Sequence, residues 1–340
     1  MDNEINILIT AASRRVAMIR GFSRAISELR LRGSVQVADT DKMSPGLRFC
    51  DKSHIVPLSG AREYIPTILD ICKKEKIRLL IPTIDEELTL FGGYKKDFEA
   101  IGATVLVSDR NVGEICNDKY LTERFFRENA FPFAKTFLPK QIDYGSIKYP
   151  LFIKPRFGRG SVGVYPVRNE TELRFFVDYI KTPVIQRYLY GKEYTVDVLA
   201  GLDGRILAVT PRERIVIRSG VCDRGKTYRN EELISISKTI CEKLGVIGPV
   251  NLQCKIDKGI ITFFEINPRF SGAIQLTVAA GSDFFTMIVQ EALGMNPEPV
   301  IGQFKDGLIM MSYEESVFEE NGSNGRSEAK LLNRHTVKRN

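Results

Sequence analysis

The stretch Phe264-Glu265-Ile266-Asn267-Pro268-Arg269-Phe270-Ser271-Gly272 indicates more about the fold than any other part of the chain. Glu265 and Asn267 are two residues apart in an apolar run, so on a strand both side chains point to the same face. A carboxylate beside an amide oxygen suits Mg²⁺, which takes few protein oxygens and completes its shell with phosphates and water. Arg269 follows and can pair with a phosphoryl group or a carboxylate. In isolation, a solvated Glu/Asn pair would explain the same residues.

The segment before this stretch is predicted to form a β-hairpin with it. Strands are expected at 251–256 and 260–265, with Asp257-Lys258-Gly259 as the turn. Gln253, on the first of these strands, is a further oxygen donor that can face Glu265 and Asn267. The candidate metal ligands are therefore Gln253, Glu265 and Asn267.

A glycine-rich loop follows a lysine in Lys154-Pro155-Arg156-Phe157-Gly158-Arg159-Gly160-Ser161-Val162-Gly163. Glycines let backbone N–H groups approach phosphate oxygens, and the lysine supplies a compact cation for the same oxygens. The pattern is not that of a P-loop, because the lysine precedes the glycines and a strand, not a helix, is expected next. Taken alone, this stretch is equally consistent with a flexible hairpin tip.

The apolar strand predicted at 184–187 runs into the short segment 188–191. Backbone N–H and C=O groups of such a segment can meet the edge of an adenine ring. Glu193 can then accept hydrogen bonds from ribose hydroxyls, as acidic groups do in other nucleotide sites. This segment carries little weight by itself.

The first 110 residues alternate strand and helix patterns, which predicts a parallel sheet. Ligands of such sheets bind beyond the carboxyl ends of the strands, where the loops 11–15, 39–41 and 83–87 are expected. A helix is predicted at 119–129, and a series of hairpin-like β-strands is predicted after Pro150. The predicted domains are 1–112, 113–190 and 191–315, followed by a polar tail at 316–340.

The composition excludes several classes of protein. The 340 residues include 49 Lys and Arg against 42 Asp and Glu, and 43% are hydrophobic, which is typical of a globular protein and not of a disordered chain. No apolar run reaches the roughly 20 residues of a membrane span, and the acidic start is not a secretory signal. Six scattered cysteines and two histidines argue against zinc and favour reduced thiols in the cytoplasm. The charge of +7 is spread out, so nucleic-acid binding is a distant alternative.

Taken together, these motifs resemble the ATP-grasp superfamily, in the order Lys119, Lys154 with its glycine loop, 186–193, Gln253 and Glu265-x-Asn267-x-Arg269. The similarity covers nearly the whole chain and is strongest to the carbamoyl-phosphate synthase large subunit and biotin carboxylase group. It implies an α/β and α+β protein in which a parallel-sheet pre-ATP-grasp lobe precedes a two-lobed ATP-grasp fold. Because the chain holds one such unit, it resembles a stand-alone ligase.

The resemblance also implies roles for individual residues. The nucleotide-binding set is Lys119, Lys154, Gly158, Gly160, Ser161, Gly163, Gln186, Arg187, Tyr188, Leu189 and Glu193. Gln253, Glu265 and Asn267 match the metal ligands, and the catalytic set is Arg269, Lys154 and Asn267. The sequence departs from the pattern at Gln186, where many relatives carry an acid.

The implied reaction is the ATP- and Mg²⁺-dependent joining of a carboxylate to an amine through an acyl phosphate, which forms a C–N bond and yields ADP and phosphate. Mn²⁺ is an alternative metal. The expected partners are a small-molecule acid and amine, with no nucleic acid and no membrane, and homodimers are common among similar enzymes. The alternative is an ATP-binding component, similar to carbamoyl-phosphate synthase, that needs a partner protein.

Arg212, Arg214 and Arg218 lie an even number of residues apart and would share one face of a strand. Three cations on one face repel each other unless an anion lies between them, so we expect them to hold the acid substrate. An exposed basic strand is the alternative. Asp85 and Glu86, at the carboxyl edge of the predicted sheet, are candidates for binding the amine.

Overall fold

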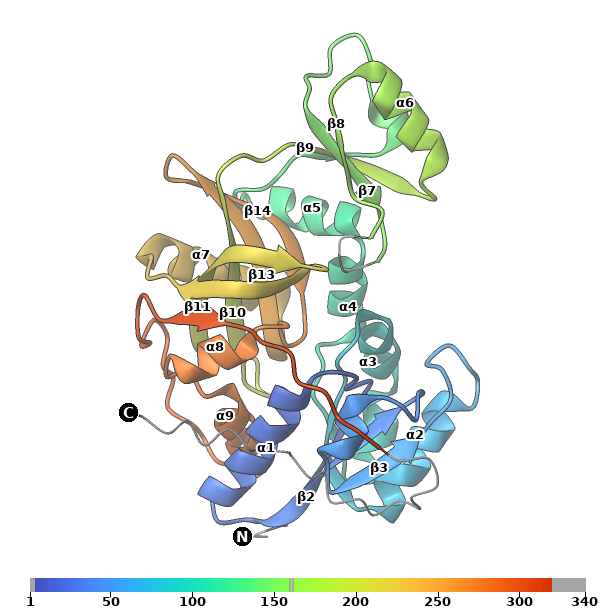
Figure 1. Cartoon of the computed structure of the whole chain (residues 1–340), viewed down its shortest axis with the longest axis vertical. Helices are drawn as coiled ribbons and strands as arrows, with labels where there is room; N and C mark the ends of the chain where they lie inside the picture. The colour runs from blue at the N-terminus through green and yellow to red at the C-terminus, as the bar shows by residue number, and fades with distance from the viewer. Residues whose placement is uncertain (1–3, 159, 161, 320–340) are drawn as a thin grey trace, which may run out of the picture.

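The computed structural model describes residues 4–158, 160 and 162–319 (Figure 1). Its strands form three sheets, which we call the N-terminal, middle and C-terminal sheets. The middle sheet lies at the top of Figure 1, the N-terminal sheet at the bottom, and the C-terminal sheet between them. The mixed architecture predicted from the sequence is confirmed.

The N-terminal sheet has five parallel strands in the order β3-β2-β1-β4-β5. Its strands are β1 (Glu4–Thr10), β2 (Arg32–Asp39), β3 (Lys52–Ile55), β4 (Ile77–Ile81) and β5 (Thr104–Val105). Helices α1 (Val16–Glu28), α2 (Tyr64–Lys74) and α3 (Asp85–Glu99), with the 3₁₀ turn η1 (Pro45–Arg48), connect them. Residues on both faces of β1 are buried, which explains its nearly continuous apolar run.

Two helices lead from this sheet to the middle sheet, α4 (Arg110–Asn117) and α5 (Lys119–Glu128). The side chain of Asp118 caps α5 by accepting from the backbone N–H groups of Tyr120 and Leu121. The cap was predicted from Asn117-Asp118, whereas α4, which contains Gly113, was not expected.

The middle sheet has four antiparallel strands in the order β6-β9-β7-β8. They are β6 (Thr136–Phe137), β7 (Leu151–Pro155), β8 (Tyr165–Val167) and β9 (Pro183–Arg187), accompanied by η2 (Pro139–Gln141) and α6 (Glu170–Tyr179). β8 begins three residues later than the strand predicted from Val162, because Gly163 has a positive φ of 71° that breaks the extended backbone.

The C-terminal sheet has six antiparallel strands in the order β14-β13-β10-β11-β12-β15. They are β10 (Lys192–Ala200), β11 (Ile206–Arg218), β12 (Val221–Thr227), β13 (Gly248–Asp257), β14 (Ile260–Asn267) and β15 (Ile309–Met311). The helices of this part are α7 (Glu231–Leu244), α8 (Ile274–Ala279) and α9 (Phe284–Ala292). The hairpins predicted around residues 201–204 and 257–259 are confirmed.

One expectation about β11 is wrong. The pairing of β11 with β12 shifts register between Arg214 and Val216 and again between Val216 and Ile217. Such β-bulges place two residues opposite one and interrupt the alternation of faces. Arg218 therefore does not share a face with Arg212 and Arg214 in the way that even spacing predicted.

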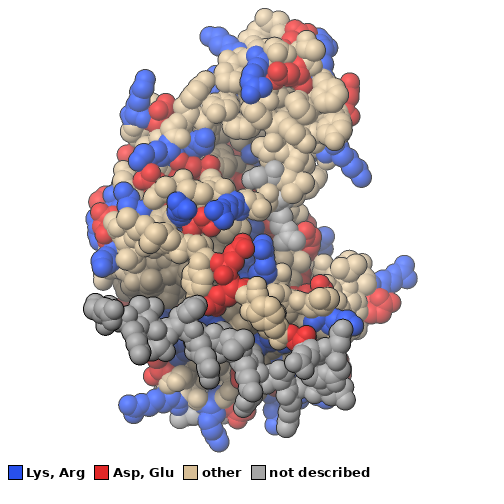
Figure 2. All heavy atoms as spheres, viewed as in Figure 1, with Lys and Arg blue, Asp and Glu red and all other residues tan. Residues whose placement is uncertain are grey.

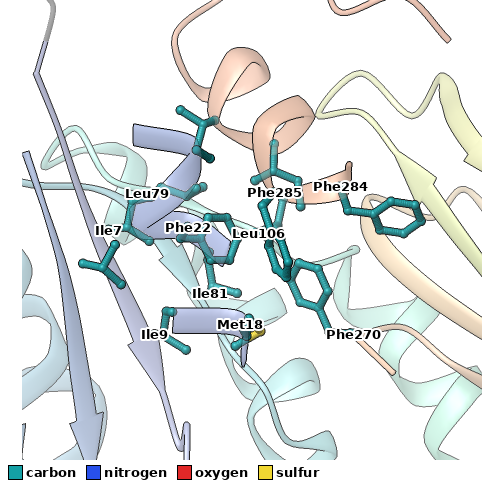
Figure 3. Packing of buried hydrophobic residues seen from close by; sticks show 14 of the residues in the cluster. Ile7, Ile9, Met18, Phe22, Leu79, Ile81, Leu106, Phe270, Phe284 and Phe285 are labelled. Carbon is teal, nitrogen blue, oxygen red and sulfur yellow. The ribbon is translucent and has the colours of Figure 1, made fainter. Parts of the chain in front are cut away.

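A hydrophobic cluster joins the N-terminal sheet to the C-terminal part of the chain (Figure 3). The ring of Phe22 on α1 lies 4.9 Å from that of Phe285 on α9 and 6.1 Å from that of Phe270, measured between ring centroids. Burying one such aromatic side chain contributes about 1.5–3 kcal/mol. Because Ala12 belongs to the same cluster, this packing brings the loop after β1 close to the segment after β14.

The chain continues from β15 across to the N-terminal sheet, where Nε of Arg48 donates to Glu319 at 2.9 Å (Figure 1). Residues 320–340, most of the predicted polar tail, lie outside the described residues. In the part of the chain that the structure describes, every helix is too short or too polar to cross a bilayer.

Candidate active site

A cavity of about 780 Å³ is lined by residues from the middle sheet, the C-terminal sheet and the loop after β1. It gathers most of the residues singled out in the sequence: Lys119, Lys154, Gly158, Gly160, Gln186, Leu189, Glu193, Arg212, Arg214, Gln253, Glu265, Asn267 and Arg269. These residues lie up to 150 positions apart in the sequence, from Lys119 to Arg269. The fold thus brings the separate motifs together around one cavity.

Oxygen donors on β13 and β14 form one wall of the cavity. The register of the hairpin pairs Gln253 with Glu265 and Asn251 with Asn267. Nδ2 of Asn267 donates to Oδ1 of Asn251 at 3.3 Å, which leaves Oδ1 of Asn267 available. Neither the Glu265 carboxylate nor the Gln253 amide makes a hydrogen bond with any described residue. This wall therefore offers one carboxylate and amide oxygens to a hard cation.

The same region contains few other metal-binding groups. Over residues 4–158, 160 and 162–319, three or more His, Cys, Asp and Glu side chains never cluster tightly enough to hold a metal ion. A metal at Glu265 would thus rely mostly on amide oxygens and on oxygens of a bound ligand, which is the usual arrangement for Mg²⁺ with phosphates. Asn251 was not predicted as a site residue from the sequence, although its spacing of two residues from Gln253 places both side chains on one face of the strand.

Lys154, near the end of β7, is buried and its Nζ donates to Oε1 of Gln186 at 2.9 Å. Nε2 of Gln186 in turn donates to Oγ1 of Thr136 at 2.9 Å, so the amide is fixed at both ends. Burial lowers the pKa of Lys154 to about 8, against the opposing effect of the Glu265 carboxylate. The hydrogen-bond acceptor of the Lys154 ammonium group is therefore the neutral amide of Gln186 and not a carboxylate.

Lys119, the first residue of α5, is tied to the glycine loop. Its Nζ donates to the carbonyl of Gly158 at 2.7 Å, and burial lowers its pKa, which the Glu265 carboxylate opposes. Asp118, the cap of α5, also accepts from Nε and Nη2 of Arg156, at 2.8 and 2.6 Å. The start of α5 and the start of the glycine loop are therefore held together. The ammonium groups of Lys119 and Lys154 both line the cavity.

The glycine loop packs against the turn between β11 and β12. A Cβ atom added to Gly220, whose φ is +75°, would lie 2.9 Å from Cα of Gly160. Of the loop residues named from the sequence, Gly158 and Gly160 line the cavity and Gly163 does not. Ser161 lies outside the described residues.

The segment after β9 brings only some of its predicted residues to the cavity. Leu189 and Glu193 line it, whereas Arg187 is exposed and Tyr188 stacks on Phe152 at 4.8 Å between ring centroids. Phe152 is itself part of the lining. Tyr188 therefore packs against Phe152 and does not line the cavity itself.

Arg269 is held by a residue of the N-terminal part of the chain. Its Nε and Nη2 donate to the two carboxylate oxygens of Asp85, at 2.6 and 3.2 Å. Asp85 is the first residue of α3, at the carboxyl edge of the N-terminal sheet as predicted. Its carboxylate is engaged by Arg269, and Glu86 does not line the cavity. The geometry assigns Asp85 to positioning Arg269.

The three arginines of β11 have different surroundings. Arg212 is only 1% exposed, and its Nε donates to Asp197 at 2.7 Å and its Nη2 to Ser271 at 2.9 Å. Nη1 of Arg212 has no hydrogen-bond partner among the described residues. Nη1 of Arg214 donates to Glu193 at 2.6 Å. The side chain of Arg218 is 67% exposed and lies outside the lining, as the bulges in β11 require.

Several lining residues were not expected from the sequence. Arg14 and Arg15, from the loop after β1, reach the cavity, as do Lys255 and residues 271–273. Lys255 follows Gln253 on the same face of β13, and its Nζ donates to the carbonyl of Leu189 at 3.0 Å. The two arginines lie in a loop that was recognised as the edge of a sheet but not assigned to this site.

Family comparisons agree with this geometry. Residues 180–316 match the family model described as ATP-grasp in the biosynthetic pathway with Ter operon. The chain carries an ATP-grasp domain. Residues 7–106 match the model of the PylC-like N-terminal domain, so the two models cover the C-terminal and N-terminal sheets. The resemblance inferred from the sequence motifs is confirmed.

Individual relatives include one of the proteins that the motifs indicated and one that they did not. The arginine-specific carbamoyl phosphate synthase large chain of Geobacillus stearothermophilus is 22% identical over 290 residues, which are 80% of this chain and 27% of that protein. The D-alanine–D-alanine ligase of Petrotoga mobilis is 25% identical over 199 residues, 54% of this chain and 66% of the ligase. The chain thus spans about a quarter of the length of the synthase.

A solved structure confirms the fold. The biotin carboxylase domain of the Hydrogenobacter thermophilus 2-oxoglutarate carboxylase, a dimer in complex with MgADP, ADP and bicarbonate, superposes with a TM-score of 0.73. The sequences are 17% identical, and the match covers 89% of this chain and 73% of the carboxylase domain. At this identity the likeness shows a shared fold.

Proposed function

We propose that this protein is an ATP- and Mg²⁺-dependent carboxylate–amine ligase that acts through an acyl phosphate and releases ADP and phosphate. The observation that carries the proposal is the convergence on one cavity of the buried Lys154, the half-buried Lys119, a wall of oxygen donors and Arg269. Similarity to a D-alanine–D-alanine ligase supports a reaction that joins a carboxylate to an amine.

The nucleotide is proposed to lie along the middle sheet. Lys119, Lys154 and backbone N–H groups of the glycine loop bind the phosphates. Phe152 and Leu189 supply apolar contacts for the adenine ring, and Glu193 accepts from the ribose hydroxyls. Arg214 occupies one oxygen of Glu193 and so orients this carboxylate toward the cavity.

Gln253, Glu265 and Asn267 would hold the metal ion through the oxygen atoms that the hairpin register brings together. When bound, Mg²⁺ neutralises charge on the phosphates and withdraws electron density from the phosphorus that is attacked. Mn²⁺ prefers the same oxygen ligands and is proposed as an alternative metal.

The chemical step needs positioning and charge neutralisation more than a protein nucleophile. A carboxylate oxygen of the acid attacks the terminal phosphorus, and the bond from this phosphorus to the bridging oxygen of ADP breaks. Arg269, oriented by Asp85, stabilises the charge on the transferred phosphoryl group, together with Lys154. The amine nitrogen then attacks the acyl carbon, the C–O bond to phosphate breaks, and phosphate leaves with the proton that the nitrogen loses.

The organisation of the chain is part of the same proposal. The strands of the three sheets span residues 4–105, 136–187 and 192–311, which supports domains at 1–112, 113–190 and 191–315 followed by a tail at 316–340. The first boundary falls inside α4, so a division before Arg110 fits the helices better.

Six cysteines without a disulfide support a cytoplasmic location. The charged side chains line a cavity, which favours small-molecule substrates over nucleic acid. A homodimer is also proposed.

A phosphate-release screen with ATP, Mg²⁺ and paired libraries of acids and amines tests the reaction, with mass spectrometry of the products. We expect turnover only when an acid and an amine are both present. Glu265→Gln removes the single carboxylate of the metal wall, and the Mg²⁺ concentration for half-maximal rate should rise about tenfold or more. An unchanged Mg²⁺ requirement in Glu265→Gln would contradict the metal assignment, and failure to bind ATP would contradict the whole proposal.

A second candidate function follows from the length comparison. The chain matches 27% of a carbamoyl phosphate synthase large chain, so it resembles one part of a protein that has further parts. An ATP-binding component of this kind would take its nucleophile from a partner protein. ATP binding without turnover of any acid and amine pair by the isolated chain would favour this candidate over the stand-alone ligase.

A further inference from the structure

Exposed apolar side chains line the cavity on two segments that pack against each other. Phe157 and Val162 belong to the glycine loop, whereas Ile217 lies near the end of β11 and Val221 begins β12. All four line the cavity, and between 41% and 77% of each residue is exposed. Large apolar side chains gathered in the wall of a cavity favour the binding of a ligand with an apolar part.

The register of the sheet and a glycine place two of these side chains. Ile217 pairs with Cys222, so their side chains share one face, and Cys222 is buried and also lines the cavity. A Cβ atom added to Gly272 would lie 2.7 Å from Cγ1 of Val221, so the absence of a side chain at Gly272 lets Val221 lie this close. We call Ile217, Val221 and Cys222 the apolar wall. It lies against the segment that follows β14.

The apolar wall is near the arginine that is proposed to meet the transferred phosphoryl group. Gly272 follows Arg269 by three residues, so their Cα atoms are at most about 11 Å apart. Asp85 accepts from Arg269 at 2.6 Å and Ser271 accepts from Arg212 at 2.9 Å, so both ends of this short segment are anchored. An acid whose carboxylate lies at Arg269 therefore reaches the apolar wall with a chain of a few carbon atoms, because both line one cavity.

We propose that the acid substrate carries an apolar group, a chain or ring of several carbon atoms, which packs against the apolar wall. Phe157 and Val162 of the glycine loop cover this group from the other side. The inference rests on the proposed ligase function and deepens it, because it restricts the class of acid and assigns the selection of that class to Ile217 and Val221.

Titrations followed by ligand-observed NMR, which detects millimolar affinities, test this inference on the full chain with Mg²⁺ and the non-hydrolysable analogue AMP-PNP. The probes are the straight-chain acids from acetate to hexanoate and the matching amines from methylamine to hexylamine. Each added methylene of the acid should tighten binding about two- to fourfold until the apolar wall is covered. The amines should show no such trend.

Val221→Thr and Ile217→Thr each exchange an apolar group for a hydroxyl and keep a β-branched side chain that suits a strand. Each should weaken hexanoate binding about fivefold and leave the affinities for acetate and AMP-PNP unaffected. The matched control is Ile215→Thr, since Ile215 is 50% exposed on the same strand but lies outside the described lining of the cavity. It should change none of these affinities.

Acid affinities that do not depend on chain length, or a dependence shown by the amines instead, would overturn the inference. So would threonine variants that bind hexanoate as the wild type does. Threonine variants that weaken AMP-PNP and every acid equally would also overturn it, because the apolar wall would then serve only to hold the glycine loop. Failure of the wild type to bind AMP-PNP would instead refute the ligase proposal on which the inference rests.

Discussion

The neutral partner of Lys154 should make the proposed nucleotide binding sensitive to pH. Nζ of Lys154 donates to the amide oxygen of Gln186 at 2.9 Å, and burial lowers the pKa of the lysine to about 8. The ammonium form binds phosphates, so affinity for ATP should be highest below pH 8 and fall as the pH rises through this value. Gln186→Glu places a carboxylate of nearly the same shape beside the same nitrogen.

The size of the effect follows from this contact. An adjacent opposite charge raises the pKa of a lysine by about 1–3 units, so the Lys154 pKa should move from about 8 to about 9–11 in Gln186→Glu. Loss of a hydrogen bond to a charged group costs about 1.5–3 kcal/mol, or about a 10- to 150-fold change in affinity. The Thr136 hydroxyl, which now donates to the carbonyl of Ala134 at 3.0 Å, can turn to donate to the new carboxylate.

The assay is titration with a fluorescent ATP analogue and Mg²⁺ between about pH 6.5 and 9.5. The wild type should lose affinity above pH 8, whereas Gln186→Glu should stay level to a pH about 1–3 units higher. Lys154→Met, which has no titrating nitrogen, is the control and should bind weakly at every pH. A wild-type affinity that does not change with pH, or a Gln186→Glu profile with the wild-type midpoint, would refute the reasoning.

Two further variants test contacts described above. Asp85→Asn removes the charge that orients Arg269, and kcat should fall about tenfold or more while the Kd for ATP stays unchanged, as steady-state kinetics and calorimetry will show; a parallel loss of ATP affinity would contradict the positioning role. Gly220→Ala places a methyl group 2.9 Å from Cα of Gly160 at a φ of +75°, so unfolding in urea should become easier by about 1–3 kcal/mol and the KM for ATP should rise. Gly204→Ala is its control, because Gly204 also has a positive φ (+84°) but its nearest neighbour would lie 3.9 Å away. Equal effects of the two alanines on KM would show that contact with the glycine loop is unimportant.

Local patterns predicted the part of the site that lies on strands. The spacing of Glu265 and Asn267 was enough to place both side chains on one face of a strand. The turn at 257–259 alone would pair Gln253 with Phe264, and a register shift between Gln253 and Cys254 places Gln253 opposite Glu265. Lys154 and the glycine loop were found for the same reason, since a strand and the loop that follows it are local in sequence.

Long-range contacts and irregular backbone could not be predicted in this way. Asp85 and Arg269 are 184 residues apart, and no pattern local to either residue indicates that they meet. The register shifts between β11 and β12 leave no clear trace in the composition of either strand, so even spacing wrongly grouped Arg218 with Arg212 and Arg214.

The ion pair between Asp85 and Arg269 has a consequence for engineering and for comparison with relatives. It crosses the junction between the segments that match the two family models, since Asp85 lies in the first and Arg269 in the second. The two segments are therefore not interchangeable modules. A chimaera that borrows its first hundred or so residues from a relative should keep Arg269 in place only if the donor also brings an acidic side chain to the first turn of α3.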